Sequence, residues 1–197
     1  MKTDVVTQPT LLSKCWPRAY SSTTRLLLLV ILGSGLLTLS AKVTIPFYPV
    51  PMTMQTFTIL VIGLAFGWKL ATATVLLYLF EGAVGFPVFA GTPAKGLGIT
   101  YMMGPTGGYL LGFLLSASLL GYLGERGFDR NVLLTTFAML LGLVVIFGFG
   151  YAWLAHLIGM ERAFQYGVQP FLLAELLKVI LAAFVLPFCW KVLGRIS

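Results

Sequence analysis

Two uninterrupted apolar runs constrain this chain more than any other feature. Residues 26–37 read LLLLVILGSGLL and residues 137–154 read FAMLLGLVVIFGFGYAWL, and neither run holds a charged residue. A membrane-spanning β-strand alternates apolar and polar residues over about 10 positions, which these runs do not do. Helices are the other way to satisfy every backbone polar group in lipid. The runs therefore predict membrane-spanning helices.

The composition supports an all-α integral membrane protein. Only 10% of the 197 residues are charged and 58% are hydrophobic, with a mean hydropathy of +0.95, whereas soluble domains average about 25% charged residues. The net charge of +7 does not indicate nucleic-acid binding, because the basic residues are scattered near the ends of the apolar segments. The two cysteines, Cys15 and Cys189, are far apart and have no metal-ligand spacing, and we predict no disulfide.

We predict six transmembrane helices, since about 20 residues cross the hydrocarbon. The expected spans are 25–41, 53–67, 69–84, 105–124, 132–158 and 170–193. The second and third are short, so we expect their ends to extend into the flanking loops. Residues 1–24 resemble a polar cytoplasmic tail rather than a cleavable signal peptide. The predicted organisation is this tail followed by a single six-helix membrane domain over residues 25–197.

The distribution of basic residues predicts that both termini are cytoplasmic, in a multi-pass protein of the cytoplasmic (inner) membrane. With that orientation, nine Lys and Arg residues fall on inner segments, three fall on outer loops, and Lys178 falls within a span. Tryptophans near span ends are expected to contact lipid headgroups. These are Trp16, Trp68, Trp153 and Trp190.

Two predicted outer loops are unusual. Residues 41–53, AKVTIPFYPVPMT, contain three prolines, and residues 81–104, EGAVGFPVFAGTPAKGLGITYMMG, are apolar and rich in glycine. The second loop is too apolar to be free in solvent. Because long loops in compact domains are commonly lids or binding loops, we expect it to fold back over the protein as a cap.

Glu175 and Lys178 lie in the apolar segment FLLAELLKVILAAF, residues 171–184. Their spacing of three places them on one helix face. If the helix enters the membrane at Pro170, Glu175 lies about 7.5 Å and Lys178 about 12 Å below the entry. Charges at such depth are costly unless paired or hydrated, and usually face an interior cavity. The residues alone leave two interpretations open: a mutual ion pair, or a site for a polar ligand.

Two further motifs lie at the starts of predicted spans. GPTGGYLLGF, residues 104–113, combines paired glycines with a helix N-terminus, which suits either an anionic or carbonyl ligand group or close helix packing. In PVPMTMQ, residues 49–55, Thr53 suits a helix cap. Gln55 has the donors and acceptor needed for a urea-like or amide ligand, although on the residues alone a structural role is favoured for both.

No motif indicates catalysis or a cofactor. The sequence has no Walker A motif, no Ser–His pair with a suitable partner, and no His-rich or Cys-rich metal set. We therefore predict that the protein is not an enzyme. Two alternatives remain: a membrane-embedded enzyme that uses Glu175 and Lys178 as acid and base, and a purely structural membrane subunit.

Four motifs together resemble the BioY family, the biotin-specific substrate-binding subunits of energy-coupling factor transporters. They are PVPMTMQ, GFPVFAG, GPTGGYLLGF and PFLLAELLK. They keep the family's order and spacing over roughly residues 40–185, and GPTGGYLLGF at the start of a span is the most specific of them.

The resemblance implies a six-helix membrane protein that binds biotin from the outer side with high affinity. The partners that it implies are a transmembrane coupling subunit and two cytoplasmic ATPases, although some biotin members are reported to act without them. Lys178 matches a family lysine, and Glu175 stands where the family has aspartate. The implied contacts are Lys178 with the valerate carboxylate and Glu175 with the ureido N–H groups.

The resemblance also suggests further site residues. Lys95 lies in the loop from which family members supply another polar or basic ligand, and Tyr109 and Phe89 are expected to contact the thiophane ring and the alkyl chain. A transporter subunit for another vitamin is the alternative within this class. The small residues of the first span are candidates for contact with a coupling subunit: Gly33, Ser34 and Thr38.

Overall fold

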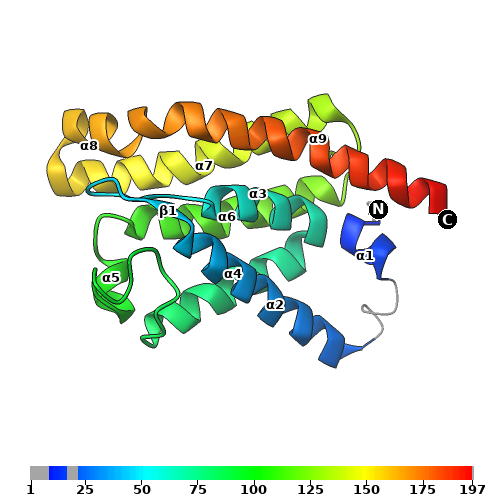
Figure 1. Ribbon diagram of the computed structural model, residues 1–197, viewed down its shortest axis with the longest axis horizontal. Helices are drawn as coiled ribbons and strands as arrows, with labels where there is room; N and C mark the ends of the chain where they lie inside the picture. Colours follow the sequence, from blue (N-terminus) through cyan, green and yellow to red (C-terminus); the bar gives the residue numbers. More distant parts are fainter. Residues whose placement is uncertain (1–8, 17–21, 197) are drawn as a thin grey trace, which may run out of the picture.

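The computed structural model describes residues 9–16 and 22–196, and it is mostly helical (Figure 1). The helices are α1 (Leu11–Cys15), α2 (Thr23–Lys42), α3 (Gln55–Phe66), α4 (Trp68–Ala83), α5 (Gly98–Met102), α6 (Gly107–Gly124), α7 (Val132–Ile158), α8 (Met160–Gly167), the 3-10 turn η2 (Gln169–Phe171) and α9 (Leu172–Ile196). Two short strands, β1 (Thr44–Ile45) and β2 (Met52–Thr53), pair antiparallel with Thr44 opposite Thr53.

The helices form a bundle around one main core. The long helices α7 and α9 run side by side along the longest axis, while α2 and α4 lie on the other side of the molecule (Figure 1). Between these two groups, α6 contacts α7, α3 and α4. The core is filled by large, fully buried side chains. They include Leu60, Tyr78, Leu120, Ile146 and Leu186.

The membrane character predicted from the sequence is confirmed, with four helical segments of the described chain long and apolar enough to cross a membrane. They are Thr23–Lys42, Gly107–Gly124, Val132–Ile158 and Met160–Leu193. The two remaining predicted spans correspond to α3, with 12 residues, and α4, with 16 residues. That these two shorter helices also cross stays a prediction.

The expectation that the second and third spans extend into their loops is wrong. Helix α3 starts only at Gln55, because the residues before it belong to the β-hairpin, whose second strand is Met52–Thr53. Helix α4 ends at Ala83. The two helices meet at Gly67, whose φ of 81° favours glycine. The Trp68 N–H that starts α4 donates to Glu125 Oε1 (3.1 Å), so this short connection is held by the α6–α7 loop.

The two ends of the bundle differ. One end carries the β-hairpin, α5 and α8, and the opposite end carries α1 and the C-terminal part of α9 (Figure 1). Helix α1 falls in the predicted tail, yet Thr10 is buried and Arg130 Nη2 donates to Pro9 O (3.2 Å). Residues 1–8 and 17–21 of that tail lie outside the described residues.

Two of the three small residues proposed for partner contact on α2 do not face outward. A Cβ on Gly33 would lie 2.6 Å from Thr74 Cγ2 of α4. Ser34 is fully buried and its hydroxyl donates to Glu81 Oε2, also on α4. Thr38 is half-buried. The expectation for Gly33 and Ser34 is therefore wrong, because these residues allow α2 to approach α4 within the protein.

Candidate functional site

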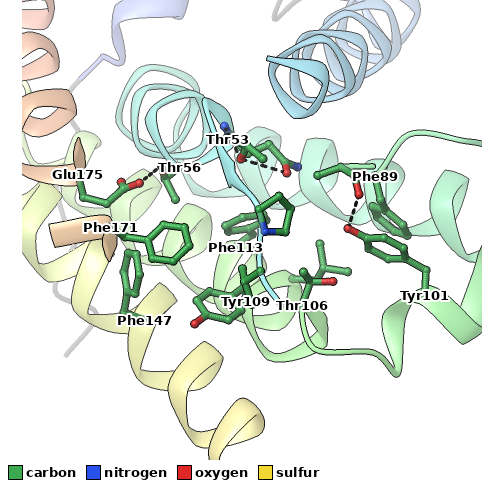
Figure 2. Close-up of a pocket in the computed structure, with 15 residues that line it drawn as sticks. Thr53, Thr56, Phe89, Tyr101, Thr106, Tyr109, Phe113, Phe147, Phe171 and Glu175 are labelled. Atoms are coloured by element: carbon green, nitrogen blue, oxygen red, sulfur yellow. Dashed lines mark hydrogen bonds between the residues drawn. The ribbon is translucent and has the colours of Figure 1, made fainter. Parts of the chain in front are cut away.

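A cavity opens at the end of the bundle that carries the β-hairpin and α5 (Figure 2). Its walls come from segments far apart in sequence: the hairpin, α3, the loop before α5, α5 itself, α6, α7, η2 and α9. The lining is mostly apolar and aromatic, with few polar groups, as in small-molecule sites. The lining residues are Val50, Pro51, Thr53, Gln55, Thr56, Phe89, Ala90, Tyr101, Thr106, Tyr109, Leu110, Phe113, Phe147, Phe171 and Glu175.

Glu175 and Lys178 form a buried ion pair beside this cavity. Lys178 Nζ lies 2.6 Å from Glu175 Oε1, and the two residues are only 8% and 4% exposed, respectively. Lys178 Nζ also donates to Thr56 Oγ1 (2.9 Å) and to Thr53 O (2.6 Å). Thr56 in turn donates to Glu175 Oε1 (2.9 Å) (Figure 2). All three ammonium hydrogens of Lys178 therefore have acceptors within the protein.

The second oxygen of the same carboxylate is different. Glu175 Oε2 is buried and has no hydrogen-bond partner within the described chain, and Glu175 lines the cavity, whereas Lys178 is not among the lining residues. Buried polar atoms are nearly always hydrogen-bonded, and each exception needs a reason. The site therefore has an acceptor without a partner on a residue that lines the cavity, whereas the ammonium group of Lys178 is fully hydrogen-bonded.

Thr53 and Gln55, two further candidate site residues, line the cavity and are hydrogen-bonded to each other. Thr53 Oγ1 accepts from the Gln55 backbone N–H (3.2 Å) and donates to Gln55 Oε1 (3.4 Å). Thr53 thus satisfies one N–H group at the start of α3, although the N-cap residue is Met54. Gln55 Nε2 donates to the Tyr78 hydroxyl (2.7 Å), which donates to Val88 O (3.3 Å). The amide is therefore held in one orientation by the protein, and it ties α3 to the loop before α5.

Phe89 forms an aromatic wall together with two tyrosines. Its ring stacks on Tyr101 at 4.9 Å and meets Tyr78 edge-on at 5.4 Å. A Cβ on Gly82 would lie 2.0 Å from Phe89 Cζ, so this wall needs glycine there. The Tyr101 hydroxyl donates to Ala90 O (2.8 Å), and burial raises the pKa of that hydroxyl, which keeps it a donor. The expectation that residues 81–104 fold back over the protein is confirmed at these buried positions.

Tyr109 lines another part of the cavity. Its hydroxyl donates to Gly167 O (2.7 Å), and its ring meets Phe147 edge-on at 5.8 Å. Phe147 in turn contacts Phe171 at 5.9 Å. The glycines of GPTGGYLLGF serve close packing, since a Cβ on Gly108 would lie 2.4 Å from a backbone oxygen of α7.

Of the predicted site residues, Lys95 alone lies apart: it is exposed and is not among the residues that line the cavity. Other lining residues were not predicted from the sequence, including Thr56, Phe147 and Phe171. Thr56 could have been found, because it follows Gln55 at the start of the same helix. Within the described residues, no cluster of His, Cys, Asp or Glu could hold a metal ion.

The fold and the site together define a helical membrane protein with a small-molecule cavity, closed by aromatic side chains and equipped with a buried acceptor. The sequence matches the BioY family over residues 12–195. The chain belongs to this family, as the motifs predicted.

Relatives and a solved structure agree with this assignment. A probable biotin transporter BioY from Pyrococcus horikoshii is 39% identical over 157 residues, covering 80% of this chain and 91% of that protein. The biotin transporter BioY of Thermotoga maritima is 35% identical, covering 77% and 88%. Both relatives are named as transporters and not as enzymes.

The fold is similar to a crystal structure of the S-component for biotin from an ECF-type ABC transporter. The TM-score is 0.70 at 22% sequence identity, over 85% of this chain and 92% of that chain. At this identity the similarity establishes the fold.

Proposed function

We propose that this protein binds biotin and takes it up across the cytoplasmic membrane. The observation that carries the proposal is Glu175 Oε2, a buried acceptor without a partner in the described chain, beside a largely apolar cavity. Biotin has the matching chemistry: N–H donors on a ureido ring, an apolar thiophane ring and a flexible chain that ends in a carboxylate. The names of the BioY relatives support the same ligand.

In the proposed complex, a ureido N–H donates to Glu175 Oε2, and Thr56 and Lys178 hold the carboxylate in place through Oε1. The rings of Phe89 and Tyr109, which both line the cavity, contact the apolar part of the ligand. A site that hydrogen-bonds a substrate N–H rejects an analogue that lacks it, because the acceptor is then buried unpaired.

The proposed contact between Lys178 and the valerate carboxylate requires a rearrangement of hydrogen bonds. For Lys178 to bind it, one of its three present acceptors has to be given up, and Thr53 O is a neutral one. Thr53 and Gln55 also carry polar groups at the cavity and complete the proposed site. Lys95 becomes a ligand only if the loop that carries it moves.

The proposed topology has six crossing helices, both termini in the cytoplasm and the cavity facing outward. The charges support it, because positively charged residues favour the cytoplasmic side. The end opposite the cavity carries six basic residues whose side chains the structure describes, against three at the cavity end. They are Lys14, Arg25, Lys69, Arg126, Arg130 and Lys191, against Lys42, Lys95 and Arg162. The proposed partners are a transmembrane coupling subunit and two cytoplasmic ATPases.

Equilibrium binding to the purified full-length protein in detergent tests the proposal. The ligands are biotin, biotin methylated on the ureido nitrogens, thiamine and riboflavin. We expect saturable binding of biotin, and binding of the methylated analogue weaker by about tenfold or more, as for the loss of one charge-assisted hydrogen bond. No biotin binding would refute the proposal, and binding of another vitamin instead would favour the alternative within the class. Recovered biotin analysed by mass spectrometry is expected to be unchanged, which separates a binding protein from an enzyme.

A further inference from the structure

Lys42, the last residue of α2, holds the loop between α4 and α6 by several contacts. Its Nζ donates to Pro87 O (2.6 Å), Phe89 O (3.0 Å), Thr92 O (3.4 Å) and Thr92 Oγ1 (3.1 Å). These three carbonyl groups and one hydroxyl all belong to residues 87–92 of that loop. One exposed side chain thus connects the end of the first long helix with four oxygen atoms of this loop segment.

The same segment forms one wall of the cavity. Phe89 and Ala90 line it, and Phe89 is 1% exposed. The backbone oxygen of Phe89 is turned to the Lys42 ammonium group, whereas its ring contacts Tyr101 and Tyr78 on the inner side. Lys42 therefore fixes the backbone of the residue whose side chain closes the site, without reaching the cavity itself.

The size of the cavity shows that a wall must move. The cavity has a volume of about 40 Å³, whereas sites for drug-sized ligands have about 300–1,000 Å³. The other walls are the β-hairpin, α5, η2 and four helices of the bundle: α3, α6, α7 and α9. Residues 87–92 form turns without a helix or strand, and three of their four contacts with Lys42 are exposed to solvent. This wall can therefore open without disrupting a helix.

We propose that Lys42 is a positioning residue that holds residues 87–92 against the cavity and thereby slows release of the bound ligand. This inference rests on the proposed function for its ligand, but not for the position of the loop. An ammonium group suits the task, because it is a compact charge with three donors that can serve several carbonyl oxygens at once. Its place at the C-terminus of α2 is also favourable for a cation.

The variants for the test are Lys42→Met, which keeps the length of the side chain and removes its charge, and Lys42→Arg, which keeps the charge. The matched control is Lys69→Met, which removes one positive charge at the opposite end of the bundle. Each full-length protein is examined in detergent by hydrogen–deuterium exchange without ligand, and by stopped-flow association and dissociation of a fluorescent biotin conjugate.

For Lys42→Met we expect faster exchange confined to residues 84–97 and a dissociation rate constant raised about tenfold, as expected for the loss of one net charge-assisted hydrogen bond. The association rate constant is expected to change less than about threefold, because a positioning contact acts mainly on dissociation. Lys42→Arg is expected to be intermediate, since a planar guanidinium group cannot serve all four oxygens.

Three results would overturn the inference. One is unchanged exchange and unchanged dissociation in Lys42→Met. Another is a slower association that Lys42→Arg restores, which would assign Lys42 to attraction of an anionic ligand. The third is faster exchange along the whole chain, which would indicate a general loss of stability.

If the unmodified protein does not bind the conjugate, the proposed function fails, and the exchange data still decide whether Lys42 holds the loop. If Lys42→Met does not fold, Thr92→Val removes one of the four contacts and is expected to show a smaller change in the same segment.

Discussion

The buried pair Glu175–Lys178 permits a test that separates its two interpretations, an internal ion pair and a ligand site. Three variants are compared: Lys178→Met, Glu175→Gln and the double variant. Each single change leaves one member of the pair without its partner, whereas the double change replaces the charges on both sides. Glu161→Gln is the control, because Glu161 is an exposed glutamate on α8.

The expected stability follows from the burial of the pair. Both residues are less than a tenth exposed, and Lys178 Nζ lies 2.6 Å from Glu175 Oε1. Removing one partner of a buried ion pair costs about 3–5 kcal/mol, whereas replacing both is often neutral. For a domain of this size 1 kcal/mol corresponds to about 2–4 °C in Tm. Each single variant should therefore melt about 6–20 °C lower, and the double variant within a few degrees of the unmodified protein.

Biotin binding is expected to follow a different pattern. Glutamine at position 175 keeps an oxygen for Thr56 but removes the charge, and it places an amide N–H or a weaker acceptor at the cavity. Losing a hydrogen bond to a charged acceptor costs about 1.5–3 kcal/mol, which corresponds to a Kd about 10–150-fold higher. The double variant should show the same loss although its stability is restored.

Thermal unfolding followed by intrinsic fluorescence and isothermal titration with biotin measure the two quantities on the same samples. A double variant that is stable and binds biotin with unchanged affinity would refute the acceptor role of Glu175 and leave an internal ion pair. Single variants that melt like the unmodified protein would show that the pair is not buried as the structure describes.

Three further predictions concern the aromatic wall and the opposite end of the bundle. Gly82→Ala should displace Phe89 and weaken biotin binding about tenfold or more, as a 1.4 kcal/mol loss does, whereas Gly35→Ala, whose Cβ would have no neighbour within 4 Å, should leave titrations unchanged. Burial raises the pKa of Asp129, so the folded state binds the proton of this carboxyl group more tightly than the unfolded state does. The free energy of unfolding should therefore fall as the pH rises from about 4 through the folded-state pKa. Asp129→Asn should flatten this dependence when unfolding is measured at several pH values. Trp190→Phe removes the hydrogen bond from Trp190 Nε1 to Asp129 Oδ2 (2.6 Å) and should cost about 1–3 kcal/mol in the same assay, whereas an unchanged Tm would contradict the contact.

The long apolar helices could be predicted from the sequence because nothing interrupts them. The predicted span 132–158 coincides with α7, and 25–41 lies within α2. The short elements could not be predicted in the same way. The β-hairpin, α5 and α8 depend on tertiary contacts at the end of the bundle. Each of these segments is too short for its apolar residues to show the period of a helix or a strand.

The polar part of the site was more predictable than its apolar part. A charge within an apolar span is rare and costly, so Glu175 and Lys178 could be predicted as site residues from the sequence alone. Phe147 and Phe171 line the cavity as well, but an aromatic residue in an apolar span faces lipid, core or ligand with the same sequence pattern. The detail that the sequence could not supply is the difference between the two oxygens of Glu175, since it depends on where Thr56 and Lys178 lie in space.

In the proposed mechanism, one part of the molecule selects the ligand and another part retains it. The acceptor Glu175 belongs to α9 and is held by Thr56 of α3, and neither residue lies in the loop segment 87–92. The contacts of Lys42 go to the loop, and it shares no hydrogen-bond partner with Glu175 among the described contacts. Changes at independent sites add in free energy to within about 0.3–0.5 kcal/mol. Combining Lys42→Met with Glu175→Gln should therefore multiply their separate effects on Kd, and a product clearly smaller than that would show that the loop and the acceptor act as one unit.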